Sequence, residues 1–496
     1  MENYLTAAST DVPNEPMSKV DTTWLRMEQP DNLMMITGFM VFSEPLDLEK
    51  FQDVIVNRLL AFRRFRQKAV RHVNGARWEK DKNFDLNTHI RSAALPGAAG
   101  KDELEAFVSD LASTPLDPTR PLWQFHLVEN YQGGYVLVTR FHHCIADGIA
   151  LIQVLLSLTD DAAEQSARKV DAKRYRKRQA TAHNLFNRLI EPAREGIDLL
   201  SHVSKLAIEE GTQLLQQPDK IRSYAEEAGA MGKELLGLLA LPDDPKTVFK
   251  GPMGSRKRVA WAESIPLHEV KAACASLECT VNDLLIAAVS GAINGWLIDR
   301  GEDLEAMGEI RATVPVNLRP LEHALELGNH FGLVFLTLPV NDSNPLSRIA
   351  KIHANMVELK SSHQAQVSLG VMATLGLSPA WVQKPFLDAI SQKASAVLTN
   401  VPGPKKPLYM AGTKVEEMMF WVPQNGEIGM GISILSYNDR VYFGLITDKL
   451  ILSEPEEIIN RFQPEFEKIL YLALNFPELT HRDHQLVESL MWQRST

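Results

Sequence analysis

The stretch from residue 161 to residue 250 constrains the fold of this chain more than any other feature of its sequence. It carries long patterns typical of helices, broken by prolines such as Pro192 and Pro218, whereas the sequence on either side alternates between strand-like and helix-like patterns. One hydrophobic core does not extend over a chain of 496 residues. The sequence therefore predicts an α/β (α+β) protein in which two domains, residues 1–160 and 251–496, are joined by a helical connector, residues 161–250.

Strand-like and helix-like segments follow one another in both flanking stretches. In the first stretch, two apolar strands are expected around a Gln-Gly-Gly turn at residues 132–134, followed by an apolar helix. In the second, strands recur between helical segments, and an amphipathic helix is expected near the end of the chain. The expected segments are residues 48–66, 122–129, 134–142, 149–158, 312–316, 333–340, 396–398, 429–435, 441–446 and 454–474.

Composition and charge exclude several classes of protein. The chain is 45% hydrophobic and 23% charged, as globular proteins are. Its apolar runs fall short of the roughly 18 residues of a membrane-spanning helix. The formal net charge of −10 argues against nucleic-acid binding as the main activity. Residues 1–16 lack the pattern of a signal peptide, and Cys144, Cys274 and Cys279 lack the spacing of a zinc site or a disulfide framework. We therefore expect a cytoplasmic protein with structural thiols.

The segment His142-His143-Cys144-Ile145-Ala146-Asp147-Gly148 joins an expected strand to an expected helix. Because side chains alternate along a strand, His142 and His143 should point to opposite faces, so that only one of them enters a given cleft. Histidine suits general-base chemistry on a hydroxyl or thiol, because its unperturbed pKa of about 6.5 leaves it mostly neutral near pH 7. Asp147 is placed to complement the start of the next helix and to hold the loop, typically by pairing with an arginine.

Three other interpretations of this segment stand beside the general base. Adjacent histidines at a strand end also occur as packed or surface residues. Cys144 is a possible nucleophile, but neighbouring side chains in a strand point in opposite directions, which separates its thiol from His143. His142, His143 and Asp147 are ligand types that suit zinc or iron, although adjacent ligands on opposite faces fit such a site poorly.

Six motifs in this chain occur in the order of a known family. The segment HHCIADG matches the HHxxxDG signature of the superfamily of chloramphenicol acetyltransferase, condensation domains and carnitine acyltransferases. PLDPTRPLWQFHLVE precedes it, and TVNDLLIAAVSGA, VPVNLRP, LGNHFGLVFLTLPV and NVPGP follow it. Over nearly its whole length, the chain thereby resembles the bacterial wax ester synthase/diacylglycerol acyltransferases.

The resemblance implies both a fold and an activity. The expected fold has two chloramphenicol-acetyltransferase-like domains with a substrate tunnel at their interface, which acyl-CoA enters from one mouth and a long-chain alcohol or diacylglycerol from the other. The expected reaction moves a fatty acyl group from coenzyme A to the alcohol, giving a wax ester, or to diacylglycerol, giving triacylglycerol. It proceeds in a ternary complex without a metal or other cofactor, and the coenzyme A thioester is a co-substrate.

The resemblance also assigns roles to individual residues. His143 is the expected base, which takes the proton of the acceptor hydroxyl and returns it to the leaving thiolate, and His142 is a supporting neighbour. Asp147 is a structural anchor. Its expected partner is Arg319 in VNLRP, with Arg311 as the second candidate.

Three further positions match the family's motifs. At Gly148 the absence of a side chain would leave room for backbone or substrate to pass closely. Asn282 and Asp283 match the ND motif, which the family associates with activity, and a polar side chain near the developing oxyanion is one role for them. The alternative is that one of them only caps a buried helix. The chain departs from the family's Pro-Met-His-like run at residues 32–36, NLMMI, so the resemblance predicts little about the N-terminal part of the tunnel.

Two basic clusters bear on partners and location. One is the run 168–178, and the other consists of Arg63, Arg64, Arg66, Lys68 and Arg71. Each is either a site for anionic headgroups or coenzyme A phosphates, or a solvated helix. Because the substrates are lipids, we expect peripheral contact with the inner membrane face or with lipid inclusions. The competing functions are an acyltransferase that uses a carrier-bound donor or a polyketide-type alcohol, a noncatalytic lipid-body protein, and a metal-dependent hydrolase.

Overall fold

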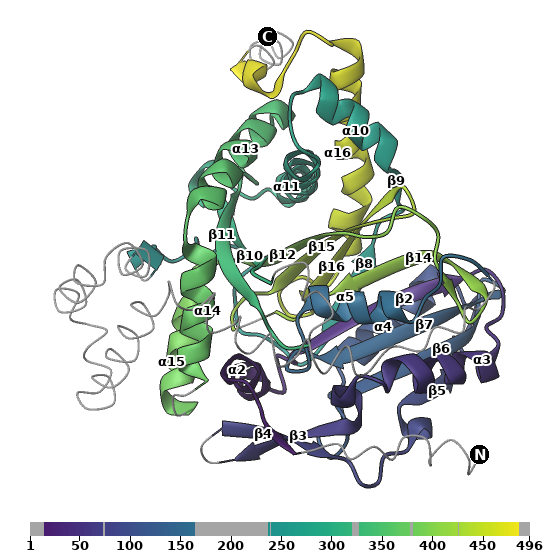
Figure 1. The fold of residues 1–496 in the computed structure, drawn as a ribbon. Coiled ribbons are helices and arrows are strands. Elements are labelled where there is room, and N and C mark those ends of the chain that lie inside the picture. Colours follow the sequence, from purple (N-terminus) through teal and green to yellow (C-terminus); the bar gives the residue numbers. More distant parts are fainter. Residues whose placement is uncertain are drawn as a thin grey trace.

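The computed structural model describes residues 14–72, 75–163, 237–238, 240–319, 327–376, 380–424 and 426–485. In these residues the strands form a six-stranded sheet, a seven-stranded sheet and a small three-stranded sheet. Helices pack on the two large sheets (Figure 1). The predicted α/β class is thereby confirmed.

The six-stranded sheet has the strand order β13-β14-β2-β7-β6-β5. Its centre is the antiparallel pair β2 and β7, whose register places Met35 opposite His142. The strands β13 and β14 come from the second half of the chain and pair beside β2, which comes from the first half. The bounds are β2 Met35–Phe42, β5 Ile90–Ala93, β6 Trp123–Tyr131, β7 Gly134–His142, β13 Tyr409–Met410 and β14 Thr413–Trp421.

The seven-stranded sheet follows the order β11-β10-β12-β15-β16-β8, and β9 pairs with β16. The contacts of β12 with β10 and with β15 are parallel, whereas the other pairs are antiparallel. The bounds are β8 Lys257–Trp261, β9 Ile265–Pro266, β10 Ile310–Asn317, β11 Phe331–Leu338, β12 Ala396–Pro402, β15 Met430–Tyr437 and β16 Arg440–Asp448. The small sheet, in the order β1-β4-β3, consists of β1 Glu15–Pro16, β4 Gly75–Lys80 and β3 Gln67–His72.

The helices of the second half pack around α11, which lies beside α10, α13 and α16 above the seven-stranded sheet (Figure 1). In the described part of the chain, α11 is the one helix that is long and apolar enough to cross a membrane, but most of it is buried in the hydrophobic core of the second half, the second core. The bounds are α2 Lys19–Met27, α3 Leu48–Val54, α4 Lys101–Ala112, α5 Gly148–Ser157, α10 Leu267–Ser276, α11 Val281–Asp299, α12 Leu304–Met307, α13 Pro345–Ser361, α14 Gln364–Leu375, α15 Ala380–Ser391 and α16 Glu456–Asn475; short helical turns occupy Ile55–Leu59, Arg63–Arg66, Leu86–Thr88 and His481–Asp483.

The helix α4 of the first half covers β8, an edge strand of the second sheet. Side chains one helical turn apart each accept one backbone N–H of this strand: Ser113 from Lys257 (2.8 Å), Ser109 from Val259 (2.9 Å) and Glu105 from Trp261 (3.4 Å). The two repeats match, because four helical residues rise about 6 Å and two strand residues rise about 6.6 Å. The exposed edge of the sheet is thus satisfied by the other half of the chain.

The expected domain limits stay a prediction. Residues 409–421 of the second half belong to the six-stranded sheet, whose other strands come from the first half. The boundary between the two sheets therefore does not coincide with the expected domain limits. Most of the expected connector, including the basic run 168–178, lies outside the described residues.

Candidate active site

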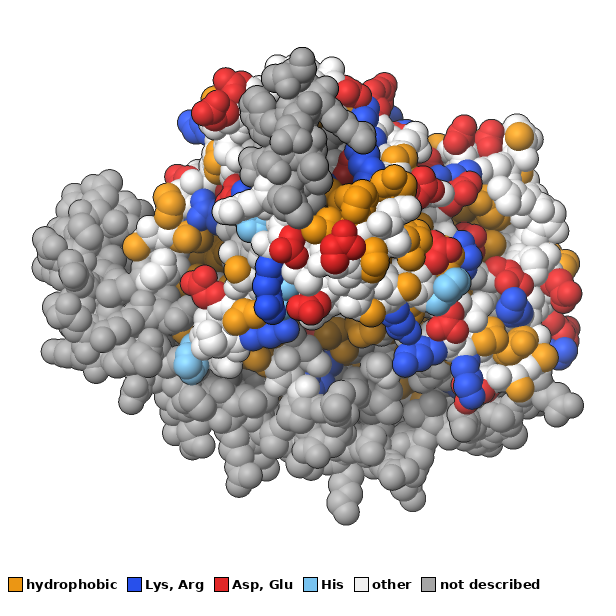
Figure 2. Space-filling model, turned by 90° about the horizontal axis from the view of Figure 1, so that it is seen from above, with side chains coloured by type: hydrophobic (Ala, Val, Ile, Leu, Met, Phe, Trp, Pro, Cys, Tyr) orange, Lys and Arg blue, Asp and Glu red, His pale blue; other side chains and the backbone are white. Residues whose placement is uncertain are grey.

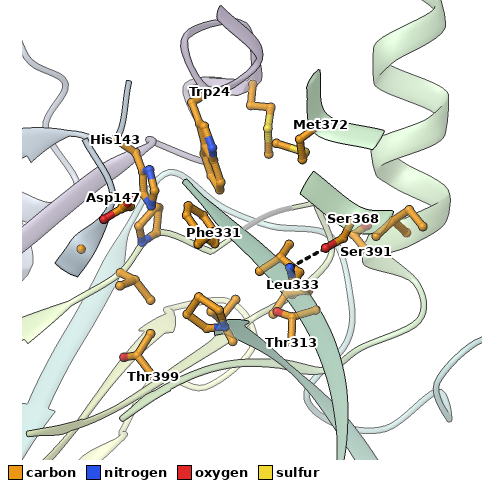
Figure 3. A pocket seen from close by; sticks show the side chains of 18 of the residues that line it. Trp24, His143, Asp147, Thr313, Phe331, Leu333, Ser368, Met372, Ser391 and Thr399 are labelled. Carbon is orange, nitrogen blue, oxygen red and sulfur yellow. Dashed lines mark hydrogen bonds between the residues drawn. The ribbon is translucent and has the colours of Figure 1, made fainter. Parts of the chain in front are cut away.

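A large apolar cavity lies between the two halves, with about 1440 Å³ of empty space including its open mouth. Its lining comes from β10, β11 and β12 of one sheet, β14 of the other, and the helices α2, α5, α14 and α15. Polar groups are few, and some are already bonded within the protein, as Ser368 Oγ is by accepting from the backbone N–H of Leu333 at 2.6 Å (Figure 3). Such a lining suits alkyl chains better than polar substrates.

His143 lies at the edge of this cavity, directly after β7. Its ring stacks on the indole of Trp24, with 4.0 Å between ring centroids and 15° between planes, and it lies 5.6 Å from the ring of Phe331 (Figure 3). The backbone N–H of His143 donates to the carbonyl oxygen of Met34 at 2.7 Å. Burial lowers the pKa of His143 to about 4, and the nearby charge of Asp147 opposes this only in part. The imidazole is therefore neutral at pH 7, as a general base must be.

His142 points away from the cavity into buried surroundings. Its Nδ1 accepts from the backbone N–H of Cys144 at 3.0 Å, and its Nε2 lies 2.8 Å from the carboxylate of Glu28. Burial alone would raise the pKa of Glu28, but contact with His142 and the charge of Arg71 bring it below the usual value. His142 thus supports the loop. Cys144 is fully buried, and burial raises the pKa of its thiol well above the usual value, which disfavours the thiolate nucleophile.

Asp147 is the N-cap of α5 and joins this helix to the second half of the chain. Its carboxylate accepts from the backbone N–H of Ala150 (2.9 Å), from the backbone N–H of His330 (3.0 Å) and from Arg319 Nη2 (2.8 Å). Burial favours the neutral carboxyl, but Arg319 and the backbone donors outweigh it and lower the pKa of Asp147. Arg311, the second candidate partner, instead pairs with Asp244 at 3.0 Å.

The loop of HHCIADG meets the segment LGNHFG directly. Ala146 and Gly328 form an isolated parallel β-bridge, and the backbone N–H of Gly328 donates to the carbonyl oxygen of Ile145 at 3.1 Å. Gly328 has φ of 105°, which favours glycine. Arg319 Nη2 also donates to the carbonyl oxygen of Gly328 at 2.7 Å. Two motifs almost two hundred residues apart therefore build one site.

Gly148 lies where the first cavity approaches a second. The second cavity has about 630 Å³ of empty space and lies between α5 and the strands β2, β7 and β14. Gly148 and Phe420 line both cavities. A Cβ on Gly148 would meet no atom within 4 Å, so backbone crowding does not explain this glycine, and the free space beside it belongs to the cavities.

The ND motif lies outside the lining of both cavities. The N-cap of α11 is Thr280, which differs from the expectation that Asn282 or Asp283 occupies that position. Asp283 completes a capping box, in which its Oδ2 accepts from the backbone N–H of Thr280 at 3.0 Å, and it lies 2.8 Å from Nδ1 of His353. Asn282 accepts from the amide of Asn400, which does line the first cavity, at 2.8 Å. The geometry favours helix capping for Asp283 over a role at the oxyanion.

Four site residues escaped the sequence reasoning, namely Asp21, Trp24, Glu28 and Asn329. The first three lie on or next to α2 at a spacing of three and four residues, which is one helical face. That spacing in VDTTWLRME was the available signal, since buried acids on an apolar face need a partner. Across the described part of the chain, no group of three or more His, Cys, Asp or Glu side chains is arranged as a metal site.

Comparison with known proteins assigns the chain to a family. Residues 17–285 match the model of the wax ester synthase/diacylglycerol acyltransferase catalytic domain, and residues 327–470 match that of the WS/DGAT C-terminal domain. A probable diacylglycerol O-acyltransferase of Mycobacterium tuberculosis is 25% identical over 468 residues, which cover 92% of this chain and 96% of that protein.

Two solved structures share the fold. The wax ester synthase/diacylglycerol acyltransferase from Marinobacter aquaeolei VT8 superposes with a TM-score of 0.65 at 22% identity, covering 92% of this chain and 99% of that one. The first condensation domain of the calcium-dependent antibiotic synthetase superposes with a TM-score of 0.59 at 11% identity, covering 95% and 98%. With both family models matched in order along its length, the chain belongs to the wax ester synthase/diacylglycerol acyltransferase family.

Proposed function

We propose that this protein transfers a long-chain fatty acyl group from coenzyme A to a long-chain alcohol or to diacylglycerol, with His143 as general base. One observation carries the proposal: a buried, neutral imidazole borders a large apolar cavity to which both halves of the chain contribute. Membership of the family and the names of its relatives support the same reaction class.

The proposed chemistry uses a single base. His143 Nδ1 is buried, so Nε2 is the ring nitrogen available to substrate. Nε2 takes the proton of the acceptor hydroxyl as its oxygen attacks the thioester carbonyl. The tetrahedral intermediate then collapses, the C–S bond breaks, and the imidazolium returns the proton to the coenzyme A thiolate. A base with a pKa of about 4 does not ionise an alcohol in advance, so proton transfer accompanies C–O bond formation.

The two cavities supply a place for two alkyl chains. They share Gly148 and Phe420, and Gly148 follows His143 by only five residues, so that chains lying in the two cavities would meet near the base. Each buried methylene contributes about 0.8 kcal/mol to binding, which favours long chains without selecting sharply between them. A relaxed choice of acceptor is the expected consequence.

The test combines palmitoyl-CoA with hexadecanol or with dioleoylglycerol. It measures the ester by mass spectrometry and the released coenzyme A by a colorimetric thiol assay. The expected result is ester and coenzyme A in equal amounts, with both acceptors used. Release of thiol without ester would indicate a thioesterase and overturn the proposal. Absence of both, when a carrier-bound palmitoyl donor does react, would instead identify the alternative donor class.

Peripheral contact with the inner membrane face or with lipid inclusions, in the cytoplasm, is a further part of this proposal, because the substrates are water-insoluble. The cluster Arg63, Arg64, Arg66, Lys68 and Arg71 serves the protein itself in part, since Arg63 and Arg64 pair with one carboxylate of the small sheet and Arg71 donates to a backbone carbonyl. The face in Figure 2 mixes acidic and basic side chains over its described residues. Co-sedimentation with anionic against neutral vesicles tests this contact, and equal sedimentation would remove the electrostatic argument.

A further inference from the structure

Asn329 connects a buried carboxylate to the loop that carries His143. The carboxylate belongs to Asp21 on α2, and both Asp21 and Asn329 are almost fully buried. Asp21 Oδ1 accepts from the backbone N–H of Asn329 at 3.0 Å and from its Nδ2 at 2.7 Å. Asn329 Nδ2 also donates to the carbonyl oxygen of His143 at 2.9 Å. One amide group thus links α2, the LGNHFG segment and the active-site loop.

The other end of this amide faces the imidazole. Asn329 Oδ1 and His143 Nδ1 are both buried, and neither has a hydrogen-bond partner within the described ranges of the chain. The two groups are neighbours, because Asn329 Nδ2 bonds the carbonyl oxygen of His143 itself. The backbone of His143 and the side chain of Asn329 both oppose the lowering of the His143 pKa by burial. A small adjustment would therefore pair an acceptor with a donor that each need one.

Asp21 decides which end of the amide faces which neighbour. The Oδ1 of Asp21 and the carbonyl oxygen of His143 are both acceptors, so both require the NH₂ end of Asn329. Turning the amide over would place its oxygen against two oxygens. This leaves the acceptor Oδ1 as the end of the amide that can accept from His143 Nδ1, whether or not Asp21 is protonated, because the Oδ1 of Asp21 accepts two N–H groups.

We propose that Asp21 and Asn329 are positioning residues that hold His143 as the Nδ1–H tautomer, with the lone pair of Nε2 presented to the acceptor hydroxyl. Trp24, one turn after Asp21 on the same helix, fixes the plane of the ring by stacking. The inference rests on the proposed role of His143 as base. A ring protonated at Nε2 instead could not take the proton of the substrate.

The effect of losing this control follows from related arrangements. For metal-ligating histidines, loss of the partner that orients the ring typically costs about 10-fold to 100-fold in activity, and we expect the same range here. A tautomer that is merely mixed, rather than wrong, falls in the same range, since part of the population stays competent. The loss appears in kcat, because the substrates bind to the apolar cavity and not to Asn329.

The test uses Asn329→Ala and Asn329→Asp, with Asn294→Ala as matched control. Asn294 is also a buried asparagine whose amide donates to a backbone carbonyl, that of Val340 at 2.8 Å, but it lies in the second core. The tautomer of His143 is read from ¹⁵N imidazole signals of histidine-labelled protein without substrate, assigned by comparison with His143→Ala. This measurement is independent of the reaction, so it remains decisive if the proposed acyl transfer fails.

The expected result for Asn329→Ala is a mixed tautomer signal and a kcat lower by about 10-fold to 100-fold at unchanged KM for acyl-CoA. Asn329→Asp keeps the volume and places a carboxylate beside Nδ1, which raises the pKa of the imidazole and moves the acid limb of kcat to higher pH. Asn294→Ala should change neither. An unchanged tautomer in Asn329→Ala, or an equal loss in the control, would overturn the proposal. If Asn329→Ala does not fold, the pH profile of Asn329→Asp decides. An acid limb of kcat at the same pH as in the unchanged protein would refute the proposal.

Discussion

The N-termini of α5 and α11 are built from the same local chemistry but differ in what approaches them. Each has a carboxylate in its capping interactions, Asp147 as the N-cap of α5 and Asp283 in the capping box of α11, and each has a histidine nearby. Among the described residues, Asp283 bonds to Thr280 and His353, both in its own half. Asp147 instead receives Arg319 from the other half of the chain and lies at the cavity. The comparison shows that the local sequence of a capped helix does not make its N-terminus part of an active site. The segment of the other half that contacts this terminus does.

The largest expected effect separates the two histidines. His143→Ala removes the proposed base, and a positioned base contributes about 10²-fold to 10⁴-fold, so kcat should fall by that factor. His353→Ala removes a half-exposed partner of Asp283 and should leave kcat within about twofold. Steady-state release of coenzyme A measures both. Comparable losses in the two variants would mean that the α11 terminus also serves catalysis.

The second effect separates the two carboxylates by stability. Asp147→Ala leaves Arg319 buried without its charge partner, which costs about 3–5 kcal/mol of the free energy of unfolding. Asp283→Ala removes a capping interaction, which costs about 1 kcal/mol. Urea unfolding at fixed protein concentration measures both values. The double variant Asp147→Ala/Arg319→Leu should recover part of the loss, and a failure to recover any of it would contradict the buried-pair explanation.

The third effect concerns pH. The base must be neutral to accept a proton, so kcat/KM reaches its plateau above the pKa of His143 and falls below that pKa. For His143 with a pKa of about 4, about nine tenths or more of the enzyme is active at pH 5.5, against about one tenth for an ordinary pKa of 6.5. Trp24→Ala admits water to the ring and should move the acid limb toward 6.5. Trp24→Phe, which keeps a stacked ring, is the control. An acid limb near pH 6.5 in the unchanged protein would contradict the lowered pKa of His143.

Local pattern accounts for those parts of the fold that could be predicted. The strand expected at residues 134–142 is β7, and the amphipathic helix expected at 454–474 is α16, because alternation and 3.6-residue periodicity are written in adjacent residues. The strand β14 was not expected, although it completes the first sheet. Its partner β2 lies more than 370 residues earlier, and no local pattern encodes such a pairing.

The site divides in the same way. His143, Asp147 and Arg319 belong to contiguous motifs, and the structure places all three around one loop. Trp24 and Asn329 matter because of where α2 and the LGNHFG segment meet that loop, which only the tertiary arrangement determines. The oxyanion role considered for Asn282 and Asp283 stays a prediction. Asp283 completes the capping box of α11, because a polar residue at a helix start serves the free backbone N–H groups there.

The smallest expected effect separates two helical glycines, Gly148 in α5 and Gly291 in α11. A Cβ on Gly291 would lie 2.4 Å from Arg348 and from Glu465, a buried ion pair, so Gly291→Ala should cost about 1–3 kcal/mol of stability. A Cβ on Gly148 meets nothing within 4 Å, so Gly148→Ala should change stability by less than about 1 kcal/mol.

Any effect of Gly148→Ala should appear in substrate choice instead. The added methyl narrows the place that both cavities share, so activity with hexadecanol should fall more than activity with octanol, by a factor of about 2 to 10. Competition between the two alcohols in one reaction measures this ratio free of errors in enzyme concentration. An unchanged ratio would separate the second cavity from the path of the substrate.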